Sequence, residues 1–136
     1  MKTSKATANE FCNAFGNAML ALHVEHAVYH YMGQLAGDKD GENPYGRWSF
    51  KKADNGAVYM VPRTGSDVEM KHLLYGKTFT LSPEAAGIAI MVHTLSHLSF
   101  QITDVRVLKV LGGLYYRLLD ILNAHNEAGT IHALLD

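Results

Sequence analysis

The sequence lacks three features that would each point to a particular class of protein. Cys12 is the only cysteine, so no intrachain disulfide can form, and a reducing cytoplasm fits this composition best. The longest uninterrupted apolar run, residues 85–92, is far shorter than the roughly 20 residues that a membrane-spanning helix requires. Near the N-terminus, Asn9 and Glu10 interrupt what would have to be the clean apolar segment of a signal peptide. These absences predict a cytoplasmic protein without a membrane segment.

The chain also lacks an excess of charge of either sign. Twelve lysines and arginines stand against thirteen aspartates and glutamates, which gives a formal net charge of −1. A nucleic-acid-binding protein usually concentrates basic residues to neutralise several phosphates, and no strong basic cluster is present. A protein that mimics DNA needs a dense acidic surface, which this composition does not supply. We therefore expect neither sequence-specific nucleic acid binding nor DNA mimicry.

The front of the chain carries the periodicity of a helix. From Phe11 to Tyr29, apolar or aromatic side chains recur every three or four residues, with His26 among them. This spacing predicts one amphipathic helix that ends before the glycine- and aspartate-rich loop 33–46. It also places His26 on the core-facing stripe.

The middle of the chain predicts strands. Residues 46–52 and 57–62 flank Asn55-Gly56, a pair that suits a type I′ hairpin turn. Residues 68–75 and 77–81 are expected to form two further strands, so that about four strands make one antiparallel meander.

A strong helix start opens the back of the chain. Ser82 can cap the helix, Pro83 occupies the first helical position, and Glu84 complements the positive end of the helix dipole. A last long helix is expected at about 105–125, where the glycine pair 112–113 predicts a kink, a break or a close contact. The whole pattern predicts an α+β fold in which all 136 residues form one domain. An N-terminal helix and two or more C-terminal helices then pack around a sheet of about four strands.

The histidines of the front helix raise the question of a metal site. His23, His26 and His30 would lie within an arc of about 60° on one helix face. About 10 Å of helix axis separates His23 from His30, whereas zinc–nitrogen bonds are about 2.0–2.1 Å, so one zinc could take only two of the three. A four-histidine site that includes His93 and His97 remains an alternative. A structural role for these histidines is the favoured interpretation.

Other catalytic patterns are absent from the sequence. It contains no GxSxG motif, no glycine-rich phosphate loop and no closely spaced carboxylate pair in an evident site. Cys12 lies beside the stripe residue Phe11, which favours a buried or boundary thiol over a nucleophile. We therefore expect no catalytic residue, no metal ligand and no cofactor, and we do not expect an enzyme.

The predicted hairpin offers a different kind of site. Trp48, Phe50 and Tyr59 lie on or near it, with Arg47 beside them. These aromatic residues fit an ordinary sheet core, but Trp, Tyr and Arg are also the residue types that dominate protein-binding hot spots. Residue patterns alone therefore indicate an α+β binding module.

The order of three motifs adds a resemblance. "YGRWSF", "NGAVYMVP" and "LSPEAAGIAIMVHTLSHLSF" resemble the antirestriction protein family of the ArdB/KlcA type. In that family an aromatic strand precedes an NG-x-x-Y-M-x-P turn and strand, and an LS-x-E/D-A-A-G-I helix follows. The resemblance covers about residues 11–125 and is strongest over 45–98. This chain departs from the pattern at Gly56-Ala57, where many relatives have two glycines, and its three front-helix histidines lie outside the pattern.

The resemblance implies a function. Such proteins are small, cytoplasmic bacterial proteins encoded on plasmids, phage-like elements or genomic islands, and they relieve type I restriction of incoming unmodified DNA. Combined with the neutral charge, this predicts protein–protein inhibition of the type I restriction-modification complex or of an associated factor. Arg47, Asp54, Asn55 and Tyr59 are the candidate partner contacts. The alternatives are a metal-binding enzyme built on the histidine cluster and another soluble protein-binding module.

Overall fold

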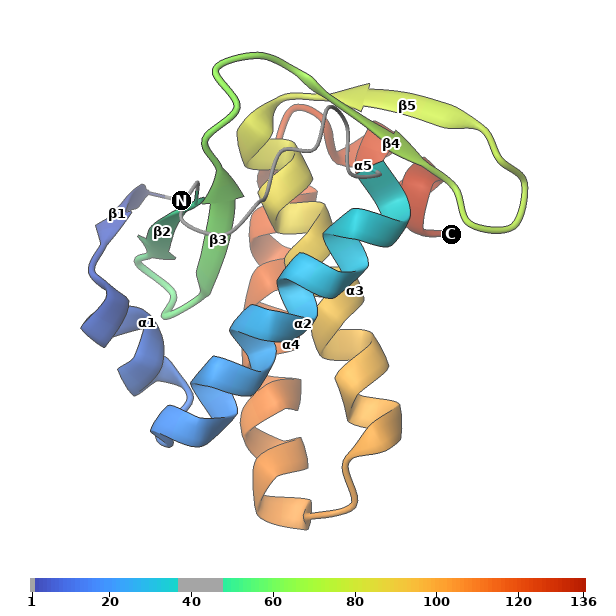
Figure 1. The fold of residues 1–136 in the computed structure, drawn as a ribbon. Helices are drawn as coiled ribbons and strands as arrows, with labels where there is room; N and C mark the ends of the chain where they lie inside the picture. The colour runs from blue at the N-terminus through green and yellow to red at the C-terminus, as the bar shows by residue number, and fades with distance from the viewer. Residues whose placement is uncertain (1, 37–47) are drawn as a thin grey trace.

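The computed structural model describes residues 2–36 and 48–136, and these residues adopt the expected α+β fold. The strands are β1 (Thr3–Ala6), β2 (Trp48–Ala53), β3 (Val58–Pro62), β4 (Val68–Lys71) and β5 (Thr78–Leu81). The helices are α1 (Ala8–Ala14), α2 (Ala18–Ala36), α3 (Pro83–Gln101), α4 (Val105–Ala124) and α5 (Ala128–Leu135). Strands β1–β3 and helix α1 lie beside the long helices α2–α4, and β4–β5 crosses one end of these helices (Figure 1).

The strands form two antiparallel sheets rather than one meander. The first has the order β1-β2-β3, and the second contains only β4 and β5. Strand β1 was not predicted, because its four residues carry no alternation of apolar and polar side chains. After Pro62 ends β3, the segment 63–67 turns the chain away, with Gly65 in the left-handed region at φ +69°. The second hairpin therefore starts a separate sheet.

The front helix is broken into two. Gly16, at φ +67°, separates α1 from α2, and the side-chain oxygen of Asn17 accepts the Met19 and Leu20 N–H groups at 2.9 and 3.3 Å. The break shifts the buried stripe of α2 away from the expected positions. Met19 is consequently 73% exposed, and His26 is exposed rather than core-facing.

Helix α3 starts as expected and forms the centre of the core. The Ser82 hydroxyl accepts the Ala85 N–H at 3.2 Å, and residues 85–92 are buried without interruption. Strand β3 and helices α2, α4 and α5 all pack against α3. Glu127, which precedes α5, bonds both the hydroxyl and the N–H of Ser82, the latter at 2.9 Å. This contact ties the start of α5 to the start of α3.

Helix α4 confirms the expected last long helix, and α5 adds a short one after it. The chain remains helical through Gly112 and Gly113, and no atom lies within 4 Å of where a β-carbon would stand at either position. The predicted break and close contact are therefore both wrong. None of the helices in residues 2–36 and 48–136 is long and apolar enough to span a bilayer.

Candidate partner-binding surface

The predicted contact residues do not form one exposed patch. Arg47 lies outside the described residues. Asp54 is exposed, Asn55 is partly exposed and Tyr59 is fully buried. The three described residues therefore differ in how far a partner could reach them.

Asn55 anchors the hairpin to the helices. Its amide nitrogen donates to the Arg117 carbonyl of α4 at 3.0 Å, and its oxygen accepts the Ala57 N–H at 3.0 Å. The Gly56 N–H donates to the Ala53 carbonyl at 3.0 Å, and Gly56 itself has a left-handed backbone conformation with φ +90°. The hairpin is thus confirmed, but its turn is a three-residue loop with a left-handed glycine rather than a two-residue type I′ turn. The Asn55 side chain serves this internal contact.

The Asp54 carboxylate is more accessible to a partner than the Asn55 side chain. Its backbone N–H donates to the Lys2 carbonyl at 3.0 Å, and its carboxylate accepts the Lys2 N–H at 3.4 Å. The side chain is otherwise exposed at the end of the hairpin. Of the predicted contacts that the structure describes, Asp54 is the one that a partner could reach most directly.

Tyr59 is a core residue, so its prediction as a direct surface contact does not fit the structure. Its hydroxyl donates to Glu84 at 3.4 Å, and the Glu84 carboxylate also pairs with Lys51. Burial raises the pKa of Tyr59 to about 12, and the negative charge of Glu84 contributes to the shift. These three side chains fasten the first sheet to the start of α3.

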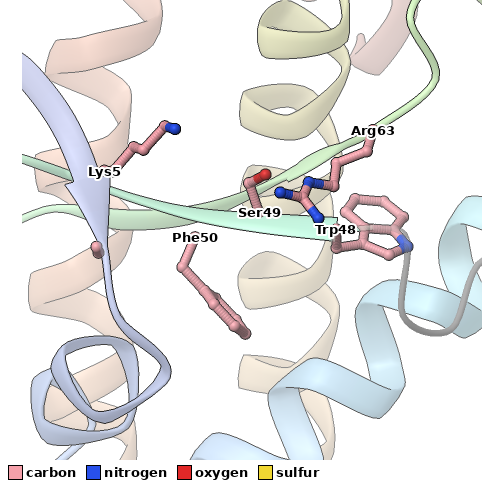
Figure 2. Close-up of a pocket in the computed structure, with 6 residues that line it drawn as sticks. Lys5, Trp48, Ser49, Phe50 and Arg63 are labelled. Atoms are coloured by element: carbon pink, nitrogen blue, oxygen red, sulfur yellow. The ribbon is translucent and has the colours of Figure 1, made fainter.

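A shallow pocket lies on the first sheet (Figure 2). Its volume of about 210 Å³ is below the roughly 300–1,000 Å³ of typical small-molecule sites, so it suits one side chain of a partner better than a cofactor. Its lining residues are Lys5, Ala6, Trp48, Ser49, Phe50 and Arg63. Sequence reasoning found the aromatic members but missed the cations, which come from separate strands and loops.

The pocket has a cationic character. Figure 2 shows Lys5, Ser49 and Arg63 on one side of β2 and the Phe50 ring on the other. Among residues 2–36 and 48–136, neither Lys5 nor Arg63 forms an ion pair. The neighbouring cation Lys51 is instead neutralised by Glu84. The arrangement can therefore receive an anionic group beside the Trp48 indole.

The histidines do not converge on one point. His23, His26 and His30 are exposed along α2, whereas the rings of His93 and His97 lie 4.0 Å apart on α3. In the part of the chain that the structure describes, no group of three or more His, Cys, Asp or Glu side chains could hold a metal ion.

Tyr31 separates the histidines of the two helices. Its ring lies 5.2 Å from His30 and 5.1 Å from His93, measured between centroids. Burial lowers the pKa of His93 to about 4, and His97 adds to this effect. The His93 ring is therefore held neutral near pH 7, as part of an aromatic cluster.

The fold and its motifs correspond to a known class of protein. The family model for antirestriction proteins matches residues 43–136, so the chain belongs to the antirestriction protein family. The antirestriction protein KlcA of Escherichia coli is 29% identical over 123 residues, which is 90% of this chain and 82% of that protein. The uncharacterized protein YfjX of Escherichia coli strain K12 is 30% identical over 125 residues, covering 90% of this chain and 76% of YfjX.

A solved structure extends this likeness to nearly the whole chain. It superposes with a TM-score of 0.83 at 25% sequence identity, covering 99% of this chain and 94% of the other. That structure belongs to a study of the KlcA and ArdB proteins. The study describes a novel fold and antirestriction activity against type I DNA restriction systems in vivo but not in vitro.

Proposed function

We propose that this protein relieves type I restriction of incoming unmodified DNA by binding a protein, without catalysis and without mimicking DNA. The observation that carries the activity is membership of the antirestriction family, together with the likeness to the KlcA and ArdB structure along 99% of the chain. The net charge of −1 argues against DNA mimicry, because a DNA mimic needs a dense acidic surface.

The target is the type I restriction-modification complex or a factor that it needs in the cell. The activity described for KlcA and ArdB occurs in vivo but not in vitro, which favours a step that requires a cellular component. The host cytoplasm, where restriction takes place, is the corresponding site of action.

The direct test is the plating efficiency of unmodified phage on a type I restricting host, with and without this protein. A non-restricting host controls for toxicity, and methylation of the host DNA is measured in parallel. Recovery of plaques with unchanged methylation is expected. Absence of recovery despite soluble, folded protein would contradict the proposal for that restriction system.

We further propose that the cationic pocket receives an acidic side chain of the partner. Two cations without ion-pair partners among the described residues line the pocket, and Arg63 lies beside the Trp48 indole (Figure 2), so the pocket suits a carboxylate that is buried on binding. The double substitution Lys5→Glu with Arg63→Glu should weaken restriction relief. Lys109→Glu changes an exposed lysine of α4 and serves as the control. Equal relief by the pocket variant and the control would exclude this contact.

A further inference from the structure

The turn between β4 and β5 presents apolar side chains where turns usually present small or polar ones. Leu73, Leu74 and Tyr75 are 53%, 83% and 77% exposed, and we call these three residues the apolar tip. Figure 1 shows this turn projecting beyond the helices. Single exposed apolar residues are common on protein surfaces, but three in succession at a projecting turn indicate an interaction site.

His72 forms several contacts with the apolar tip. This histidine is only 7% exposed, and its Nδ1 atom accepts the N–H groups of both Leu74 and Tyr75 at 3.1 Å. Its ring also stacks on Tyr75, with ring centroids 4.6 Å apart. One buried side chain therefore fixes the backbone of the tip and supports one of its rings.

Backbone bonds close the same turn. The His72 N–H donates to the Lys77 carbonyl at 2.8 Å, and the Gly76 N–H donates to the His72 carbonyl at 2.9 Å. Gly76 takes φ +70°, a left-handed conformation that glycine adopts without strain. Because the free protein already holds this shape, little ordering entropy is lost when the tip binds.

The charged residues that neighbour the apolar tip along the chain have one sign. Lys71 and Lys77 flank it and are exposed, and the sequence contains no aspartate or glutamate from residue 70 to residue 83. The Lys77 ammonium lies 5.3 Å from the centre of the Phe79 ring, so it lies alongside the strand. The tip is therefore an apolar wedge with a cationic border.

We infer that the apolar tip docks into an apolar pocket of a protein partner whose rim carries carboxylates. This inference rests on the proposed function and names a docking element on the antirestriction protein, separate from the cationic pocket of the first sheet. Tyrosine is a favoured hot-spot residue, and a preorganised turn suits a receptor of defined shape. The apolar tip with its flanking lysines and the cationic pocket both suit a partner with acidic side chains.

Other occupants fit the same observations less well. A fluid lipid surface does not require a fixed turn geometry, and two lysines neutralise too few phosphates for nucleic acid binding. In a second copy of the chain, the pocket on the first sheet is bordered by Lys5 and Arg63, which would repel the lysines around the tip.

The first experiment removes the apolar side chains. Leu74→Ser with Tyr75→Ser is compared with Phe100→Ser, which alters an 88% exposed apolar residue at the end of α3. Circular dichroism and thermal unfolding establish that both variants are folded. We expect phage plating on the restricting host to fall to the vector level with the tip variant and to stay at the wild-type level with Phe100→Ser.

The two proposals fail in different ways in this experiment. If the wild-type protein gives no relief, the proposed function is wrong for that host. If the wild-type protein gives relief and the folded tip variant gives equal relief, the docking inference is overturned.

A second experiment tests His72 as a positioning residue. His72→Asn places an acceptor oxygen where Nδ1 stands, whereas His72→Phe keeps a ring but removes the acceptor. We expect His72→Asn to retain most of the restriction relief and His72→Phe to lose it, with both variants folded. Equal relief by the two variants would show that the bonds to the tip do not matter.

A third experiment tests the chemistry of the partner. Lys71→Glu with Lys77→Glu should abolish relief, and Lys71→Arg with Lys77→Arg should preserve it, if carboxylates border the receptor.

Purified wild-type and tip-variant proteins are also compared by analytical ultracentrifugation and by sedimentation with phosphatidylglycerol vesicles. If a dimer or a vesicle complex forms only with the intact tip, the inference that the tip docks into a carboxylate-rimmed pocket of a protein partner is overturned.

Discussion

Gly87 of α3 lies directly against the Met60 carbonyl of β3. A β-carbon at Gly87 would stand 2.2 Å from the Met60 oxygen and 3.1 Å from the Val61 Cα. Both neighbours are backbone atoms, so a side-chain rotation cannot relieve the clash. The glycine of the LSPEAAGI segment therefore sets how closely the first sheet packs on the central helix.

Gly87→Ala should destabilise the protein by about 3 kcal/mol, because the added methyl group must push strand and helix apart. The measurement is the free energy of unfolding in urea. A variant as stable as the wild type would show that the sheet and helix can separate at little cost.

Alanine at Gly112 or Gly113 should have the opposite effect. Both glycines lie inside α4 with no atom within 4 Å of the added methyl group. Each substitution should raise the free energy of unfolding by about 0.5–1 kcal/mol, since alanine loses less backbone entropy in a helix. Urea titration of the single variants beside Gly87→Ala tests this contrast. If either alanine substitution lowers the free energy of unfolding, the glycine it replaces is needed for packing or for the backbone conformation of α4.

The burial of His93 predicts a dependence of stability on pH. Its pKa of about 4 in the folded protein lies below the value near 6.5 expected for an unfolded chain. The unfolded state therefore takes up the proton first, so stability should be lost as the pH falls from about 6.5 to about 4. After allowance for solvent screening, the loss from this group is about 1–2 kcal/mol.

His93→Phe is the variant that isolates this effect. It keeps a ring between Tyr31 and His97 and removes the buried Nε2 atom, which has no hydrogen-bond partner among the described residues. Thermal unfolding from pH 7 to pH 5 should show a shallower decline for His93→Phe than for the wild type. The exposed His26→Gln variant should keep the wild-type slope, and identical slopes for all three proteins would contradict the assignment.

Tyr59→Phe should have little effect on restriction relief. It removes a hydroxyl that donates to Glu84 at 3.4 Å, which should cost about 1 kcal/mol of stability. Tyr59→Ala should cost about 3–5 kcal/mol, because it opens a cavity in the core. Unfolding measurements paired with phage plating separate the two effects. Loss of restriction relief in a fully folded Tyr59→Phe variant would show that this hydroxyl takes part in partner binding.

The elements with strong local signals were predictable from the sequence. Ser82, Pro83 and Glu84 marked the start of α3, and the glycine within 54–56 marked a hairpin, because each satisfies a local backbone requirement. The break at Gly16 also had a signal, a glycine followed by Asn17 as a helix cap, but the regular apolar spacing across it was misleading.

Features that depend on distant contacts were not predictable in this way. Strand β1 is defined by its pairing with β2, and nothing in its own four residues indicates a strand. The apolar run 73–75 continued the pattern of a strand, and only the fold shows that His72 turns it outward. Tyr59 and Asn55, which are part of the recognisable motif, join the first sheet to α3 and α4, so these motif residues report on the fold more directly than on a binding surface.

The pairing of β1 also orders events during synthesis. Thr3 is opposite Ala53 in the sheet, so β1 has no partner strand until about fifty further residues have been synthesised. Closing a loop of this length costs entropy before any contact repays it, which makes such pairing slow. Strand β1 therefore stays unpaired during synthesis until β2 has been made, whereas α1 and α2, which lie between the two strands, need only local hydrogen bonds to form.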